Sequence, residues 1–328
     1  MNIEQGPNNW NKSETEQEPA VFNFETLDPR NTPEAKAANE AVLSNGTVYG
    51  IEVTVPALAE QCSLGNIDPQ HTEGDVNRAA IEDALTVEIP PEGTTFVTVR
   101  ADLDSIGSMV VLNLRAKGEE FSEEALDRVN IIATTDKFAR GEWTPKSIPT
   151  KENPWNEGVS TAESSRDIAA IAAAVMDFKL PLTERVAILE EWILTGKEPL
   201  QYREKVERER LDLINALENG EIKTETLAEG KIAVVESGHR AATNIGYSLA
   251  PVVVALNPAF RLGGGEPHRK YTICQYSGTH VDLKAVFAEL SALESGWGGS
   301  PNIGGSPQGM SSELSIDQVT EIVEKHLL

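Results

Sequence analysis

Two aspartates separated by a single residue are the strongest chemical signal in the sequence. Asp102 and Asp104 follow a β-branched run at 94–99 (TTFVTV), which predicts a buried strand. Alternate residues of an extended segment project to the same side, so both carboxylates can face one point. Carboxylate oxygens are the ligands that Mg²⁺ and Mn²⁺ prefer. The alternative is one loop aspartate and one that caps the following helix.

Two further acidic segments are predicted at strand ends. Asp68 and His71 follow the segment 62–67, and Asp136 follows a predicted strand at 130–134. Ligands of parallel sheets collect at the carboxyl ends of the strands. A lone loop histidine more often makes only hydrogen bonds, so a ligand role for His71 depends on the carboxylates beside it. The repetition favours one metal site, with the candidate ligands Asp68, His71, Asp102, Asp104 and Asp136.

A glycine-rich segment and a short basic cluster near the C-terminus could bind an anion. Glycines at 298–305 would expose backbone N–H groups, and neighbouring serines would add hydroxyl donors. A surface loop with ordinary turn glycines explains this composition equally well. The candidate substrate-binding residues are His268, Arg269, Lys270, Gly298, Gly299, Ser300, Gly304, Gly305 and Ser306. His239 and His280 have no evident partners and are interpreted as structural or surface residues.

The chain is strongly acidic. Of its 328 residues, 52 are Asp or Glu and 28 are Lys or Arg, which gives a formal net charge of −24. Such a chain repels polyanions, so the composition argues against a binder of duplex nucleic acid. A small phosphorylated substrate or a short single-stranded oligonucleotide stays compatible, because bound divalent cations can invert the local field.

Cysteine content and apolar runs point to the cellular location. The two cysteines, Cys62 and Cys274, are too few for a disulfide framework and lack metal-ligand spacing. The N-terminal segment does not have the pattern of a secretory signal, and the apolar runs fall short of the roughly 20 residues of a membrane span. The sequence therefore predicts a cytoplasmic protein with no membrane association.

The order of the predicted elements indicates an α/β fold. Residues 1–45 lack periodic hydrophobicity and are expected to form a mobile tail, and the alternative is an ordinary extension that wraps over the body of the protein. Strand and helix patterns alternate over 46–160, beginning with a strand at 47–55, which predicts a parallel sheet covered by helices. Helical spacing dominates 161–225, and β-branched runs return over 226–328. We expect a parallel-sheet N-terminal domain, a helical connector and a smaller α/β C-terminal domain.

The segment VTVRADLDSIGS at 97–108 resembles the first motif of the DHH phosphoesterase superfamily, in which a buried strand ends in Asp-x-Asp-[Ala/Ser]-x-Gly-Ser. The segments RKYTICQYSG and GWGGSPNIGGSPQG are similar to the small substrate-binding (DHHA1) domain of these proteins. The resemblance covers about residues 94–140 and 230–328. Two features depart from it. Thr98 stands where the superfamily has a histidine, and the nearest equivalent of Asp-His-His, Asp68-Pro69-Gln70-His71, precedes the first motif instead of following it.

The resemblance implies metal-dependent hydrolysis of a phosphodiester or phosphoanhydride in a cleft between two domains. Mn²⁺ or Mg²⁺ would be held by Asp102, Asp104 and Asp136, which would carry the catalysis, together with Asp68 and His71. The residues at 268–270 and the glycine loop would bind a short oligonucleotide, a cyclic dinucleotide or polyphosphate.

Two other interpretations stay open. The missing motif histidines favour a catalytically degenerate relative that binds a nucleotide or serves as a scaffold. The acidic loops could also be the solvated surface of a structural protein. The sequence leaves open how many ions bind and whether the chain forms a homodimer.

Overall fold

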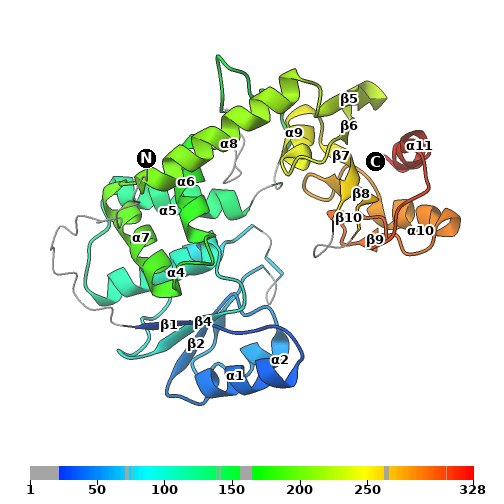
Figure 1. Cartoon of the computed structure of the whole chain (residues 1–328). Helices are drawn as coiled ribbons and strands as arrows, with labels where there is room; N and C mark the ends of the chain where they lie inside the picture. Colours follow the sequence, from blue (N-terminus) through cyan, green and yellow to red (C-terminus); the bar gives the residue numbers. More distant parts are fainter. Residues whose placement is uncertain are drawn as a thin grey trace, which may run out of the picture.

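The computed structural model describes residues 22–70, 74–75, 77–137, 139, 142–155, 165–261, 266–307 and 309–328. These residues form two α/β lobes joined by helices (Figure 1). The predicted fold class is therefore confirmed. No helix within these ranges has the length and apolar character that crossing a membrane requires.

A four-stranded sheet forms the centre of the first lobe. Its strand order is β1 (Asn23–Thr26), β4 (Thr95–Thr98), β2 (Val48–Ile51), β3 (Asn66–Ile67). All three neighbouring pairs are parallel, as the sequence predicts. The carboxyl ends of these strands consequently lie along one edge of the sheet.

Part of the predicted tail belongs to this sheet. Residues 22–45 include β1 and the helix α1 (Pro33–Leu43), which Thr32 caps by accepting a hydrogen bond from Ala35 N. The rings of Phe22 and Phe24 pack against Phe96 of β4, at centroid distances of 4.5 and 6.2 Å. The prediction of a tail up to residue 45 is corrected here, because two buried phenylalanines offset the chain entropy that the polar composition suggested would dominate.

Helices cover both faces of the first sheet. One face carries α1 and α2 (Pro56–Ala59), and the other carries α4 (Leu103–Ala116) (Figure 1). Residues 103–114 of α4 are all buried, because α3 (Ala80–Ala84), α5 (Glu123–Asp136) and α7 (Leu182–Thr195) pack around it. A helix that is buried on every side forms the centre of a core and fixes the positions of its neighbours.

The predicted strand at 130–134 is instead part of α5. Ser122 begins this helix by accepting a hydrogen bond from Ala125 N at 3.2 Å. The buried residues Ala125, Val129, Ile132 and Ala133 recur at helical spacing, and this periodicity outweighs the β propensity of the Ile131-Ile132 pair. Asp136 therefore lies at the end of a helix and not after a strand.

The predicted helical connector at 161–225 contains three helices, of which the first two pack in the core of the first lobe and only the last spans both lobes. They are α6 (Arg166–Val175), α7, and α8 (Leu200–Glu218). The long helix α8 runs from α6 in the first lobe to α9 (Ala242–Leu249) in the second (Figure 1). Charged side chains cover most of α8 because only a few of its residues, such as Tyr202 and Leu213, are buried.

The second lobe contains a six-stranded mixed sheet. Its order is β5 (Lys223–Leu227), β6 (Ile232–Glu236), β7 (Val252–Phe260), β8 (His268–Gln275), β10 (Ile303–Gly305), β9 (Gly298–Gly299). Only the pair β6–β7 is parallel, and α9 connects these two strands. Val253 faces α9, whereas Val252 and Val254 face α10 (Leu283–Leu293) and α11 (Ile316–Lys325), as the two-residue period of a strand requires.

Gly246 allows α9 to lie close to β7. A Cβ atom at this position would clash with both γ carbons of Val253, one of them at 2.9 Å. Val253 is fully buried and β-branched, so it has no other rotamer available without moving its neighbours. We expect Gly246→Ala to lower the free energy of unfolding by about 1–2 kcal/mol, even though alanine favours helix. Urea denaturation measures this loss.

The double variant Gly246→Ala/Val253→Ala tests the cause of that loss. Removing the γ carbons of Val253 relieves the clash, so the two substitutions together should cost less than the sum of their separate effects. Strict additivity would contradict a steric origin.

Candidate functional site

Acidic side chains gather at the carboxyl edge of the first sheet. Glu52 directly follows β2, Asp68 directly follows β3, and Asp102 and Asp104 follow β4. Asp136 ends α5. The pKa of Glu52 is raised to about 10. Burial is the largest cause, and the negative charges of these four aspartates add to it. The parallel sheet thus brings four of the predicted metal ligands close to one further carboxylate; His71, the fifth, lies outside the described residues.

Glu52 is the member of this cluster that the sequence did not identify. It is 8 % exposed and has a left-handed backbone, with φ of 52°, which is uncommon for a residue other than glycine. It lies within the strand that the sequence predicts at 47–55. The strand ends at Ile51, so Glu52 turns into the cluster. An acidic residue inside an otherwise apolar strand was the available signal.

Asp104 is almost fully buried at the start of α4. Its carboxylate accepts backbone hydrogen bonds from Ala80 N at 2.7 Å and Ile81 N at 2.9 Å, which are the first N–H groups of α3. Burial and the nearby charge of Asp136 nevertheless raise the pKa of Asp104 well above its ordinary value. The hydrogen bonds fix its orientation, while its neighbours disfavour its ionisation.

Asp102 is the N-cap of α4. Its carboxylate accepts a hydrogen bond from Ser105 N at 3.2 Å, the Ser105 hydroxyl accepts one from Asp102 N at 3.0 Å, and Arg100 forms an ion pair with it at 3.4 Å. The two aspartates therefore do not lie in one extended segment, because the helix begins at Leu103. Helix capping, one of the alternatives for this motif, describes Asp102 and does not prevent its second carboxylate oxygen from facing the cavity.

Gln70 connects two parts of the cluster. Its side-chain amide donates a hydrogen bond to Asp136, which joins the loop after β3 to the end of α5. Asp68, at 3 % exposure, lies in the same loop. The end of α5 is also held by an ion pair of 2.8 Å between Lys137 and Glu82.

The donor chemistry of the cluster suits a hard divalent cation. All five groups present oxygen, as Mg²⁺ and Mn²⁺ prefer, and the accumulation of like charge favours either protons or a cation. In the described ranges, however, no three His, Cys, Asp or Glu side chains are arranged so that they could hold one ion together. The cluster therefore fits a cation in its chemistry but would have to rearrange to coordinate it.

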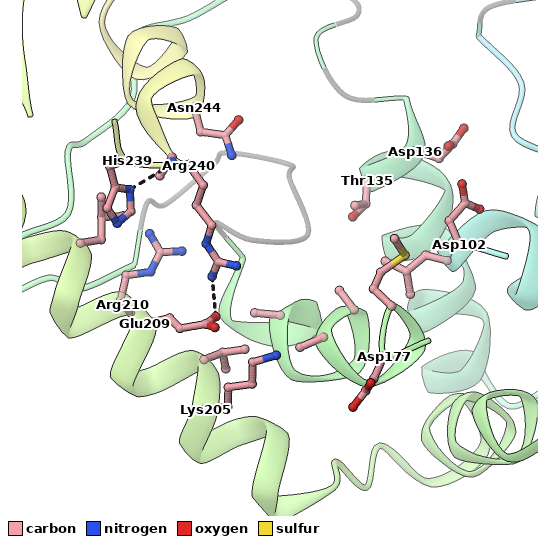
Figure 2. A pocket seen from close by; sticks show the side chains of 18 of the residues that line it. Asp102, Thr135, Asp136, Asp177, Lys205, Glu209, Arg210, His239, Arg240 and Asn244 are labelled. Atoms are coloured by element: carbon pink, nitrogen blue, oxygen red, sulfur yellow. Dashed lines mark hydrogen bonds and ion pairs between the residues drawn. The ribbon is translucent and has the colours of Figure 1, made fainter. Parts of the chain in front are cut away.

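A cavity of about 760 Å³ opens from this cluster toward the second lobe. Figure 2 shows Asp102 and Asp136 on one side, and Lys205, Arg210 and Arg240 on the other. Side chains of α6, namely Ala169, Ala172, Ala173 and Met176, line the space between. An acidic end, an apolar strip and a basic end thus share one cavity.

The basic end is built from α8 and the loop between β6 and α9. Arg240 forms an ion pair with Glu209, and the guanidinium of Arg210 lies 4.5 Å from the ring centroid of Trp155. His239 Nδ1 accepts a hydrogen bond from Ala241 N at 3.1 Å, and burial lowers the pKa of His239, followed by the charge of Arg240. The sequence interpretation of His239 as a structural or surface residue missed its place in the cavity. Its position in a strand-to-helix loop was the available signal.

The predicted substrate-binding residues lie elsewhere in the second lobe. Arg269 donates hydrogen bonds to the carbonyls of Ser312 and Leu314, and Lys270 donates one to Ser306 O. The glycines form the β9–β10 hairpin, where Gly299 pairs with Gly304 so closely that a side chain would clash. None of the nine predicted substrate-binding residues lines the cavity. They are His268, Arg269, Lys270, Gly298, Gly299, Ser300, Gly304, Gly305 and Ser306. Their role in substrate binding stays a prediction.

Comparison with known proteins assigns no family. No family model and no curated protein matches the sequence. One solved structure, described as the pGpG-specific phosphodiesterase PggH from Vibrio cholerae, is similar over 85 % of this chain and 98 % of its own. The two sequences are 10 % identical and the TM-score is 0.40, so the likeness assigns neither a family nor an activity.

The raised pKa of Glu52 predicts a pH-dependent stability. Its pKa is about 10 in the folded protein against an ordinary 4.5, so between these pH values only the unfolded chain loses the proton. Ionisation then favours unfolding, and stability falls as pH rises through this window. In EDTA at pH 8, we expect Glu52→Gln to be more stable than the wild type by at least about 1 kcal/mol, with a flatter pH profile. Denaturation from pH 5 to 9 measures both.

Glu60→Gln is the matched control, because Glu60 is an exposed glutamate at the end of α2. Its stability profile should follow that of the wild type. Identical profiles for all three proteins would mean that Glu52 is ionised in the folded state.

Proposed function

We propose that this protein is a divalent-cation-dependent phosphohydrolase that cleaves a phosphodiester or phosphoanhydride. One observation carries the proposal: carboxylates at a sheet edge and a group of cationic side chains occupy opposite ends of the same cavity. An acidic end can hold a cation, and a basic end can hold a phosphate that a chain of net charge −24 would otherwise repel.

Asp102, Asp104 and Asp136, with Asp68 and His71, are the proposed ligands of Mn²⁺ or Mg²⁺. When bound, the ion would lower the pKa of a water molecule and neutralise charge that develops on the phosphate. Gln70 would keep Asp136 oriented through its hydrogen bond, and the N–H groups of Ala80 and Ile81 would do the same for Asp104. These partners would orient Asp104 and Asp136, while the cluster as a whole would rearrange to surround the ion.

Arg240, Lys205 and Arg210 are the proposed anion-binding groups. Arg240 pairs with Glu209, and a phosphate would compete for the same guanidinium. The apolar side chains of α6 would exclude water between the two ends. Small phosphorylated compounds and short single-stranded oligonucleotides are the proposed substrates, and a cytoplasmic location and a homodimer stay predictions.

One observation favours a second candidate, a catalytically degenerate protein that binds a nucleotide without cleaving it. The described residues contain no ready arrangement of three metal-ligating side chains. A protein of this kind would still use the basic end of the cavity. Calorimetry distinguishes the two functions, because the degenerate protein should bind a nucleotide in EDTA and leave it intact after Mn²⁺ is added.

We expect the purified protein with Mn²⁺ to hydrolyse at least one of four compounds: a short oligonucleotide, a cyclic dinucleotide, polyphosphate or pyrophosphate. Asp136→Asn should lower kcat by about 100-fold or more, because it removes a charged ligand. Asp127→Asn is the control, since Asp127 is an exposed residue on the same helix. Product release is followed by chromatography, with EDTA added to a parallel sample. Absence of turnover in a folded protein, or equal loss in both variants, would reject the proposal.

The basic end predicts a different kinetic signature. Arg240→Gln should raise KM by roughly 10-fold or more and change kcat little, because a charge-assisted hydrogen bond contributes about 1.5–3 kcal/mol and its loss affects ground and transition states alike. Arg208→Gln, at an exposed position of α8, should have the kinetics of the wild type. A fall in kcat at unchanged KM would instead give Arg240 a role in the chemical step.

A further inference from the structure

Arg100 brings a positive charge to the acidic end of the cavity. Its Nε lies 3.4 Å from Oδ2 of Asp102, and its side chain lines the cavity and is 77 % exposed. The other arginines and lysines that line the cavity belong to α8, to the loop before α9 or to the loop after α6. Arg100 is therefore a cationic lining residue in direct contact with a proposed metal ligand.

The two carboxylate oxygens of Asp102 have different partners. Oδ1 accepts the hydrogen bond from Ser105 N that caps α4, so the helix occupies this oxygen. Oδ2 pairs with Arg100. A divalent cation bound to Asp102 would take Oδ2, because taking Oδ1 would break the cap of a helix that lies in the core. The guanidinium and the cation would thus compete for one oxygen.

The backbone of Arg100 is held firmly, whereas its guanidinium is held weakly. Arg100 N donates a hydrogen bond to the Thr98 hydroxyl at 3.2 Å, and Arg100 O accepts one from the Ser105 hydroxyl at 2.8 Å. Among the described residues, the guanidinium makes no second ion pair or hydrogen bond. An ion pair with so exposed a cation contributes little to stability, so changing its partner costs little. After leaving Asp102, the guanidinium would stay at the acidic end.

We propose that Arg100 exchanges Asp102 for the phosphate of the substrate, so that it contacts the reacting phosphate and leaves Oδ2 of Asp102 to the cation. This inference rests on the proposed function and adds a catalytic residue to it. The exchange places charges of alternating sign next to one another: carboxylate, divalent cation, phosphate and guanidinium. A guanidinium can bind phosphate through two parallel hydrogen bonds, which its one contact with Asp102 does not provide. Because phosphate would free Oδ2, phosphate and the cation should each strengthen the binding of the other.

Calorimetry with magnesium chloride tests the exchange without any turnover. Arg100→Gln should bind Mg²⁺ about 1.5- to 5-fold more tightly than the wild type, because the ion no longer competes with an exposed ion pair. Inorganic phosphate should tighten Mg²⁺ binding by the wild type, and in the variant this gain should be smaller by about the same factor. Arg30→Gln is the matched control and should behave as the wild type. Arg30 pairs with Asp28, also two residues away, its side chain is 74 % exposed, and it does not line the cavity.

Kinetic measurements test the contact with phosphate. With saturating Mn²⁺, Arg100→Gln should lower kcat by roughly 10- to 100-fold for the compound that the wild type hydrolyses, because it removes a charge-assisted hydrogen bond to the reacting phosphate. A residue that only stabilised the fold would not slow the reaction and at the same time make the cation bind more tightly.

The inference and the proposed function fail separately. If the wild type hydrolyses none of the four compounds but the calorimetric differences appear, the proposed hydrolysis is rejected and the exchange of partners stands. Equal or weaker binding of Mg²⁺ by Arg100→Gln overturns the exchange, whether or not the wild type is active. Tighter binding of Mg²⁺ with an unchanged kcat overturns the role of Arg100 at the reacting phosphate.

Discussion

Carboxylates of like charge are held together at the carboxyl edge of a parallel sheet, and the candidate site depends on how their repulsion is relieved. Burial removes the water that would screen them, so the charged form of each becomes costly. The structure offsets part of this cost locally: N–H groups of α3 bind Asp104, Arg100 pairs with Asp102, and Gln70 binds Asp136. The remainder appears as a raised pKa for Glu52, to about 10, and for Asp104. A divalent cation would relieve the same repulsion and favour loss of the protons that these groups retain.

The packing around α4 makes this arrangement possible. Because α4 is buried on every side, its first turn is fixed relative to α3, α5 and α7. The positions of the capping residue Asp102 and of the buried Asp104 are therefore fixed with it. Arg185 extends the same rigid frame to the end of α6, where the cavity changes from carboxylate to apolar lining. The acidic end is therefore part of the core of the first lobe, and coordinating an ion there would require side chains held by these contacts to rearrange.

The basic end has a different physical origin. Arg240 and His239 come from a loop of the second lobe, and Lys205 and Arg210 come from α8, which reaches that lobe. The lysine and arginine side chains of this end are longer than the aspartates of the acidic end. Lys205 and Arg240 are also exposed, and Arg240 forms an ion pair with Glu209. Surface ion pairs contribute little to stability and exchange partners readily. The cavity thus combines an acidic end that is packed into the core of the first lobe with a basic end whose side chains are partly exposed.

The sequence by itself determined the α/β class, the parallel first sheet, the helical connector and the position of Asp68, Asp102 and Asp104 at strand ends, because alternation, helical period and chain direction are local properties. It placed Asp136 near them for a mistaken reason, because the β-branched pair Ile131-Ile132 suggested a strand where the chain forms the helix α5. Glu52 and Arg240 were not identified, and His239 was interpreted as a structural or surface residue. Only the tertiary structure decided that residues more than 100 positions apart, such as Asp102 and Arg240, face the same cavity. That pairing depends on the path of α8 and on the close packing of α9 against β7 at Gly246. The hydrophobic pattern of a sequence indicates which face of an element is buried, but it does not indicate which other element covers that face.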